Sequence, residues 1–177
     1  MSALEDLYRE IILDHYRSPR NRGELPVPPA HRAEGFNPLC GDEIVVYLQV
    51  DDGKVSDLRI GGQGCSISQS SASMMSAAVK GRTTAEARRL ISSFKAMMSI
   101  HEHSISAGSE ADGAGDDGAG EPPDAEPAEG SAALEADGLG ELAALQGVVK
   151  FPVRIKCATL SWITLAQGLD EATADRP

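Results

Sequence analysis

Apolar residues near the start of the chain recur with the spacing of an amphipathic helix. Their positions fall at i, i+3, i+4, i+7 and i+8, which predicts a helix over residues 4–17. Ser2 and Glu5 have the spacing of a capping box at its start, and Ser18-Pro19 is typical of a helix end. The apolar face consists of Leu4, Leu7, Tyr8, Ile11 and Ile12.

Strict alternation of apolar and polar residues follows in the middle of the chain. Residues 44–50 and 55–60 alternate on either side of Asp51-Asp52-Gly53, a pattern that predicts a β-hairpin. Residues 18–38 contain five prolines and predict an extended loop instead. Val148–Ile155 is also extended, and Pro152 inside it indicates an edge strand or a bend.

Helical patterns occupy most of the remaining chain. A helix of small residues is predicted from about Ser66 to Lys80, after the Gly61–Gly64 break. Thr83 and Glu86 form a capping box for the next helix. A short helix is expected around residues 140–146, and a last helix is expected to open at Cys157. The apolar side of the helix after Thr83 consists of Leu90, Ile91, Phe94, Met97 and Met98.

This order of elements predicts a single α+β domain spanning residues 1–177. Its expected core is a small antiparallel sheet of about three strands with helices packed on one face. A chain of this length can bury a core of its own.

The acidity of the chain is concentrated in one segment. Of its 27 acidic residues, twelve lie between Glu102 and Val149, where there is no Lys or Arg, and the rest of the chain has 15 acidic and 16 basic residues. Residues 104–130 are almost entirely Gly, Ala, Ser, Pro, Asp and Glu, which predicts a disordered acidic insertion within the domain. The sequence contains no basic run for nucleic acid and no apolar run long enough to span a membrane. The first residues do not resemble a signal peptide, so we expect a cytoplasmic protein.

Three cysteines are the chemically notable residues. Cys40 and Asp42 share one loop, and Cys65 and Cys157 are each expected where a helix begins, a position that favours a thiolate. Three thiolates and a carboxylate suit tetrahedral Zn²⁺, and the resulting charge of −2 would require nearby cations such as Arg154. The residues alone leave metal binding, inert buried cysteines and a cysteine nucleophile all open.

Four motifs follow one another along the chain. They are Leu4-Glu5-Asp6-Leu7-Tyr8 with Ile12-Leu13-Asp14-His15-Tyr16, then Asn37-Pro38-Leu39-Cys40-Gly41-Asp42, then Gly64-Cys65-Ser66-Ile67-Ser68, and finally Arg154-Ile155-Lys156-Cys157-Ala158. Together they resemble the U-type iron–sulfur cluster assembly superfamily, and the chain looks most like its SufU branch. Lys156 stands where the IscU-type scaffold has a histidine, and the insertion at residues 98–145 is also typical of SufU.

The resemblance implies a SufE/NifU-like sandwich fold and a zinc-dependent sulfurtransferase of the SUF system. It implies that Cys40, Asp42, Cys65 and Cys157 hold Zn²⁺. It further implies that Cys40 accepts persulfide sulfur from a pyridoxal-phosphate-dependent cysteine desulfurase of the SufS type, with a histidine of that enzyme taking the vacated zinc position. The sulfur would then pass to a cluster scaffold of the SufBCD type. Arg154 is a candidate catalytic residue that would steady the persulfide, or a surface cation that balances the site.

Two alternatives remain beside sulfur transfer. One is a scaffold that assembles a [2Fe–2S] iron–sulfur cluster on the same ligands, against which Lys156 counts because it removes an imidazole ligand. The other is a structural zinc module, although structural zinc sites tend to be closed.

Deleting residues 104–130 is expected to leave zinc binding intact, because that segment contains none of the candidate ligands. Metal analysis of the deleted and intact proteins, purified in parallel, tests this expectation. Loss of stoichiometric zinc in the deletion would contradict it.

Overall fold

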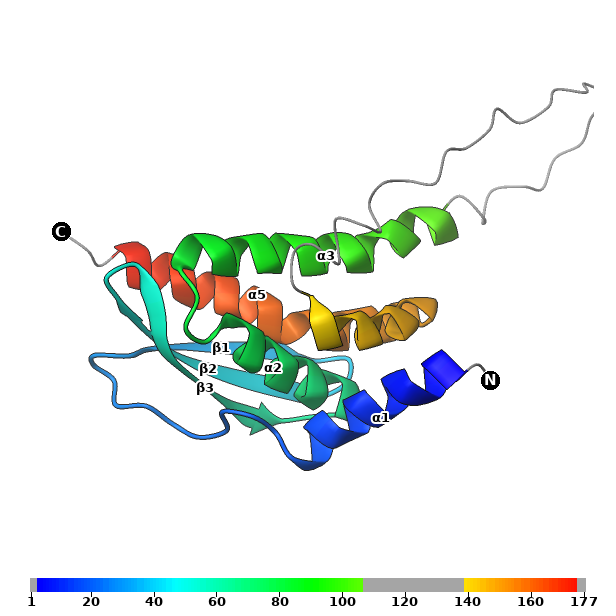
Figure 1. Ribbon diagram of the computed structural model, residues 1–177, viewed down its shortest axis with the longest axis horizontal. Helices are drawn as coiled ribbons and strands as arrows, with labels where there is room; N and C mark the ends of the chain where they lie inside the picture. The colour runs from blue at the N-terminus through cyan, green and yellow to red at the C-terminus, as the bar shows by residue number, and fades with distance from the viewer. Residues whose placement is uncertain (1–2, 107–138, 175–177) are drawn as a thin grey trace, which may run out of the picture.

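The computed structural model describes residues 3–106 and 139–174, and for residues 100–106 it describes the backbone alone. One antiparallel sheet in the order β1-β2-β3 carries helices on one face (Figure 1). The predicted α+β class is therefore confirmed. The elements are α1 (Ala3–Arg17), β1 (His31–Asn37), β2 (Asp42–Asp51), β3 (Lys54–Gln63), α2 (Ser66–Val79), α3 (Thr84–Ser106), the 3₁₀ helix η1 (Gly140–Lys150) and α5 (Pro152–Ala174).

The predicted hairpin is confirmed as the β2–β3 pair. Asp51 pairs with Lys54, so that Asp52 and Gly53 alone form the connection. Both have positive φ, 50° and 74°, as a tight two-residue hairpin turn requires, and glycine tolerates that conformation best.

The third strand is not where the sequence pattern put it. β1 lies within the stretch predicted as a loop, and it pairs along its length with β2. The alternation of apolar and polar residues in β1 is not visible in the sequence, because its two buried positions are Ala33, which is small, and Asn37, which is polar. The strand or bend expected at residues 148–155 is wrong, because η1 occupies its first part and α5 begins at Pro152. Proline is favoured at the first helical position, since its missing N–H would be unpaired there in any case.

The helices α2 and α5 lie directly on the sheet, and α3 lies over them (Figure 1). The small side chains of α2 let it pack closely, and five of its six serines are buried. Their hydroxyls are satisfied in part by backbone carbonyls: Ser70 donates to Ser66 at 2.6 Å and Ser71 donates to Ala158 of α5 at 2.6 Å. α2 thus packs tightly without leaving these two hydroxyls unpaired.

An aromatic pair anchors α3 to α5. The rings of Phe94 and Trp162 stack with centroids 4.4 Å apart, and both side chains are fully buried. The Trp162 indole N–H donates to the Ser71 hydroxyl at 3.2 Å, which ties the pair to α2. The capping box of α3 is confirmed, because Thr83 N–H donates to the Glu86 carboxylate and Glu86 N–H donates to the Thr83 hydroxyl.

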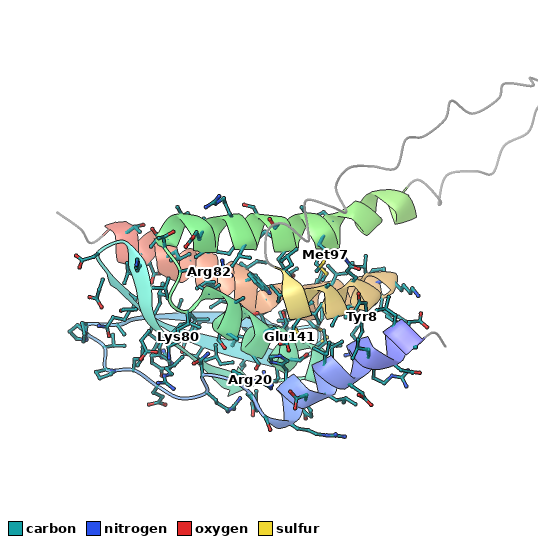
Figure 2. The ribbon with its side chains drawn as sticks, in the orientation of Figure 1. Tyr8, Arg20, Lys80, Arg82, Met97 and Glu141 are labelled. Atoms are coloured by element: carbon teal, nitrogen blue, oxygen red, sulfur yellow. The ribbon has the colours of Figure 1, made fainter. Side chains whose placement is uncertain are left out.

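η1 joins the helical layer between α1 and α3. Met97 of α3 points toward it, and Glu141 at its start reaches the buried His15 ring of α1 at 2.7 Å (Figure 2). The acidic insertion predicted at residues 104–130 lies outside the described residues except for its first three, which belong to α3. Among the described helices, none is long and apolar enough to cross a membrane.

Replacing Phe94 with alanine is expected to cost about 3–5 kcal/mol of unfolding free energy, because it removes a fully buried ring and leaves a cavity. Urea unfolding measures this loss. The matched control is Phe36→Ala, whose ring is 59% exposed and whose loss should cost about 0.5 kcal/mol or less. Equal losses in the two variants would contradict the placement of the core.

Candidate metal centre

Cys40 and Asp42 belong to the turn between β1 and β2. Asn37 and Asp42 form the last pair of that ladder, so that residues 38–41 make a four-residue hairpin loop. Gly41 has a φ of 69°, and its N–H donates to the Asn37 carbonyl at 2.8 Å. Cys40 is therefore exposed near the tip of a closed loop, whereas Asp42 is fully buried at its base.

Cys65 caps the helix that follows β3. It is the N-cap residue of α2, and its sulfur accepts a hydrogen bond from Ser68 N–H at 3.4 Å. Its own N–H donates to Asp42 Oδ1 at 2.9 Å. These bonds fix Cys65 against the buried carboxylate. The expected position of Cys65 at a helix start is confirmed.

Cys157 does not open the last helix as expected. α5 starts five residues earlier, so Cys157 lies in its second turn, where the free N–H groups of the helix start are no longer available. Its side chain is fully buried and faces the hairpin loop. The position of Cys157 in the helix therefore does not favour the thiolate form, and the groups around the sulfur determine its protonation state.

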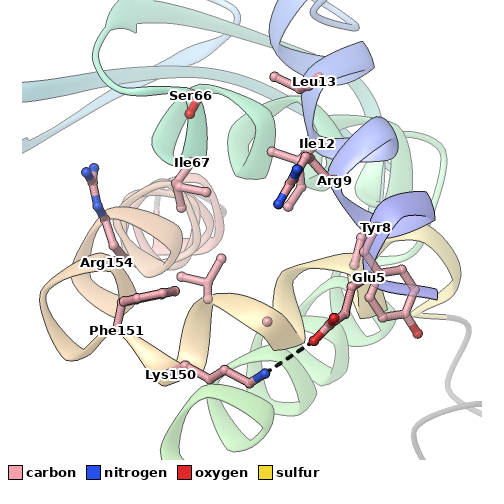
Figure 3. Close-up of a pocket in the computed structure, with 13 residues that line it drawn as sticks. Glu5, Tyr8, Arg9, Ile12, Leu13, Ser66, Ile67, Lys150, Phe151 and Arg154 are labelled. Carbon is pink, nitrogen blue, oxygen red and sulfur yellow. Dashed lines mark hydrogen bonds and ion pairs between the residues drawn. The ribbon is translucent and has the colours of Figure 1, made fainter. Parts of the chain in front are cut away.

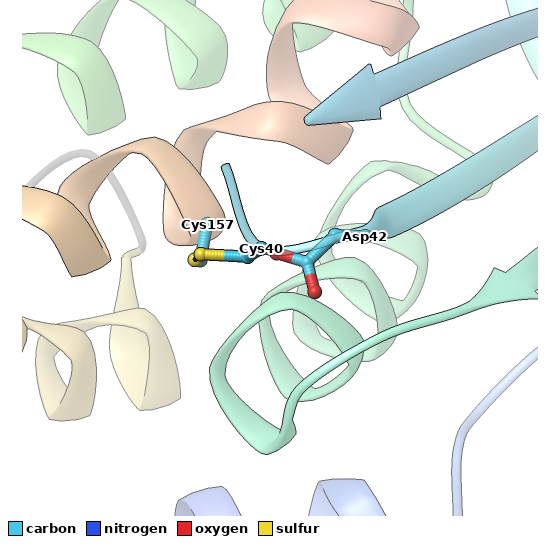
Figure 4. A group of neighbouring side chains, drawn as sticks. All are labelled: Cys40, Asp42 and Cys157. Atoms are coloured by element: carbon cyan, nitrogen blue, oxygen red, sulfur yellow. Dashed lines mark hydrogen bonds between the residues drawn. The ribbon is translucent and has the colours of Figure 1, made fainter. Parts of the chain in front are cut away.

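The fold brings three of the four predicted ligands into one cluster. The ligand atoms of Cys40, Asp42 and Cys157 all lie within 4.8 Å of one another (Figure 4). The Cys40 and Cys157 sulfurs are 3.4 Å apart. Cys65 is not one of this trio, but its sulfur lies 3.9 Å from Asp42 Oδ2.

These separations can be compared with a tetrahedral zinc site. Sulfur ligands at about 2.3 Å from the metal lie about 3.8 Å from each other. The 3.4 Å between the Cys40 and Cys157 sulfurs is near that value. Soft thiolates with one carboxylate are also a donor set that zinc accepts. The residues present therefore fit a zinc ion, and the four-ligand set stays a prediction.

Burial sets the protonation of Cys157. It raises the pKa of that thiol far above its ordinary value, and the neighbouring Asp42 and Cys40 side chains add to the rise. Without a metal, Cys157 is therefore a neutral thiol at physiological pH. A metal ion that binds there has to displace its proton.

Arg154, the cation predicted to balance the charge of the site, is not a member of the cluster. Arg154 and Lys156 are both exposed on the first turns of α5. The Arg154 guanidinium forms no ion pair with any residue that the structure describes, and it lines a cleft of about 800 Å³ with Ser66 and Ile67 (Figure 3). This cleft lies between α1, the start of α2, η1 and the start of α5. Its other apolar or aromatic side chains are Tyr8, Ile12, Leu13, Ala144, Val148 and Phe151.

Two residues that shape the centre were not singled out from the sequence. Asn37 is 6% exposed, and its amide lies between the hairpin loop and Cys157. Gly64 has no side chain where a Cβ would meet Asp42 Oδ1 at 2.5 Å. An asparagine before proline is a turn signal that would have indicated the start of the loop. The need for glycine at position 64 depends on a contact with Asp42, 22 residues earlier in the chain, which no local pattern contains.

A three-stranded sheet with helices on one face and a cysteine–aspartate cluster at its end defines a class of protein. The chain belongs to the NifU-like N-terminal domain family, whose model matches residues 7–116. It is thus a member of an iron–sulfur cluster assembly family that includes proteins of the SufU and IscU types.

Several relatives cover nearly the whole chain. The zinc-dependent sulfurtransferase SufU of Bacillus subtilis (strain 168) is 39% identical over 166 residues, which are 94% of this chain and 91% of the relative. The iron–sulfur cluster assembly scaffold protein IscU of Streptococcus pyogenes serotype M1 is 33% identical over 96% of this chain and 86% of its own length. A crystal structure of FiSufU, assigned as a scaffold protein for the SUF system in Fervidobacterium islandicum AW-1, superposes with a TM-score of 0.66 at 27% identity, covering 90% of this chain and 94% of that one.

The apparent zinc affinity is expected to rise with pH between about pH 6 and 8. The raised pKa keeps Cys157 protonated in the metal-free protein, so each proton released on binding contributes about tenfold per pH unit. Competition with a chromogenic chelator at several pH values measures this slope. An affinity that does not change with pH would contradict the account.

Proposed function

We propose that this protein is a zinc-dependent sulfur carrier for iron–sulfur cluster assembly. Cys40, Asp42, Cys65 and Cys157 hold the zinc ion, and Cys40 accepts sulfur from the persulfide of a pyridoxal-phosphate-dependent cysteine desulfurase. The SUF-type apparatus, with a SufS-type donor and a SufBCD-type acceptor, is the natural setting for this activity. Support for it comes from the similarity to the Bacillus subtilis protein, which is named for zinc and sulfur transfer.

One observation carries the proposal: the members of the cluster differ in exposure. Cys40 is exposed, while Asp42 and Cys157, the other two members, are each 0% exposed. A site that served structure alone would be expected to close over all of its ligands. Here one thiol faces solvent on a loop, and a persulfide on another protein can reach it.

The chemistry is a thiol–persulfide exchange. Bound zinc would supply the positive charge that keeps the cysteines ionised near neutral pH. The Cys40 thiolate attacks the terminal sulfur of the donor persulfide, so that a new S–S bond forms on Cys40. The donor's own S–S bond breaks, and the donor cysteine leaves as a thiolate. Electrons balance within the exchange, and no oxidant or reductant is consumed.

The surroundings of Cys40 suit contact with a protein partner. Leu39 beside it is 68% exposed, and Phe151 and Val153 near the start of α5 are 61% and 59% exposed. Exposed apolar side chains of this size are typical of interaction surfaces when they gather together. Arg154, on the same turn of α5, carries a positive charge that would steady an incoming persulfide anion.

A [2Fe–2S] scaffold is the second candidate. The IscU-type relatives are named as scaffolds, and the same three thiols and carboxylate suit iron as well as zinc. Lys156 is exposed and supplies no imidazole next to Cys157. Zinc-dependent sulfur transfer therefore remains the preferred function.

Changing Cys40 to alanine is expected to abolish sulfur acceptance without unfolding the protein, because the side chain is exposed. Desulfurase turnover with and without the protein measures activity, and mass spectrometry locates the added sulfur atom. The matched control is Cys157→Ala, which removes a fully buried ligand and should lower both zinc content and stability.

Stimulation that persists in Cys40→Ala, or sulfur found on Cys65, would contradict the proposal. Bound iron and sulfide with a visible absorption band, and no stimulation of the desulfurase, would indicate the scaffold instead.

A further inference from the structure

The three cysteine sulfurs differ in how the protein holds them. The Cys65 sulfur accepts from Ser68 N–H at 3.4 Å, within the cap of α2. The Cys157 sulfur lies 3.9 Å from the Asn37 side-chain nitrogen. Among the described residues, the hydrogen-bond contact of the Cys40 sulfur is with Cys157, at 3.4 Å. Two sulfurs therefore face a protein N–H donor, and the exposed one does not.

Asn37 is fixed at both ends of its side chain. Its Oδ1 accepts from Leu39 N–H at 3.1 Å, which leaves the NH₂ group to face Cys157. Its carbonyl accepts from Gly41 N–H at 2.8 Å. One buried residue thus closes the loop that carries Cys40 and also directs a donor at the ligand on α5.

In the metal-free protein the Cys157 thiol has two possible acceptors for its proton, the Cys40 sulfur at 3.4 Å and the Val153 carbonyl at 3.9 Å. Once that proton is displaced, the sulfur can only accept hydrogen bonds, and the Asn37 amide is the donor that faces it. Groups that hydrogen-bond to metal ligands fix the orientation of those ligands and tune their bonding to the metal.

From these contacts we propose that Asn37 is a positioning residue that keeps Cys157 in place as a ligand while Cys40 leaves to take up sulfur. Asn37 and the Ser68 N–H thereby make Cys157 and Cys65 the retained ligands, and Cys40 the mobile one. This role rests on the proposed zinc site, and its test does not depend on sulfur transfer.

Asn37→Ser isolates the contact with Cys157. A serine hydroxyl still accepts from the N–H two residues on and so keeps the turn, but it is too short to reach Cys157. The matched control is Asn21→Ser, which removes an amide bonded to Ser76 at 3.1 Å, away from the cysteine cluster. Asn21 has a φ of 54°, so the control also tests for a general loss of stability.

The first readout is the spectrum of each protein loaded with Co²⁺. Loss of the Asn37 donor should move the thiolate-to-cobalt charge-transfer band to longer wavelength, because an unbonded thiolate gives up electron density more readily. Asn21→Ser should leave the band where the wild type has it.

The second readout is zinc release after Cys40 has been alkylated with iodoacetamide. Transfer to a chromogenic chelator should be about tenfold faster in Asn37→Ser than in the wild type, as is usual for loss of a group that orients a ligand. Asn21→Ser should release zinc at the wild-type rate.

An unshifted band in Asn37→Ser, or a release rate equal to that of Asn21→Ser, would overturn the role of Asn37 alone. A wild-type protein that shows no thiolate-to-cobalt band would instead overturn the zinc site, and the proposed function with it.

Discussion

The packing of α5 across the β1–β2 pair determines whether a metal centre exists in this protein. Cys157 is 117 residues from Cys40 in the chain, and only this packing brings their sulfurs together. Gly35 of β1 makes the approach possible, because a Cβ at that position would lie 2.1 Å from the Thr164 hydroxyl of α5. On the same helix, Trp162 holds α5 against α3 and α2. The site at one end of the sheet therefore depends on a core contact some distance from it.

The same arrangement explains why the ligands differ from one another. Cys157 belongs to a helix buried against the core, and Cys65 is held by the cap of α2 and by the Asp42 carboxylate. Cys40 is on the hairpin loop between β1 and β2, which is closed by the last residue pair of that ladder. A binding site assembled in this way has two cysteines held by the core or by hydrogen bonds and one exposed thiol, and the proposed sulfur transfer depends on that difference.

Much of this could be predicted from the sequence, because the signals are local. The β2–β3 turn and the capping box of α3 each depend on a few neighbouring residues, and both were found correctly. β1 was missed because it has few apolar residues, and its pairing with β2 supplies the stability that its own composition lacks. The helical start at Pro152 was taken for an interruption of a strand, and this error also misplaced Cys157 at the start of the last helix.

The candidate ligands were named from the sequence, but their arrangement in space was not predicted. The motifs around Cys40, Asp42, Cys65 and Cys157 point to the family, and the fold brings three of the four within one cluster. The burial of Cys157 and its contact with Asn37 arise from elements more than a hundred residues apart. No spacing or periodicity in the chain encodes that contact.

X-ray absorption at the zinc edge of the purified protein tests the central claim most directly. The account predicts three sulfur scatterers at about 2.3 Å and one oxygen at about 2.0–2.2 Å from the metal. A shell with fewer than three sulfurs, or an iron edge in place of the zinc edge, would contradict it.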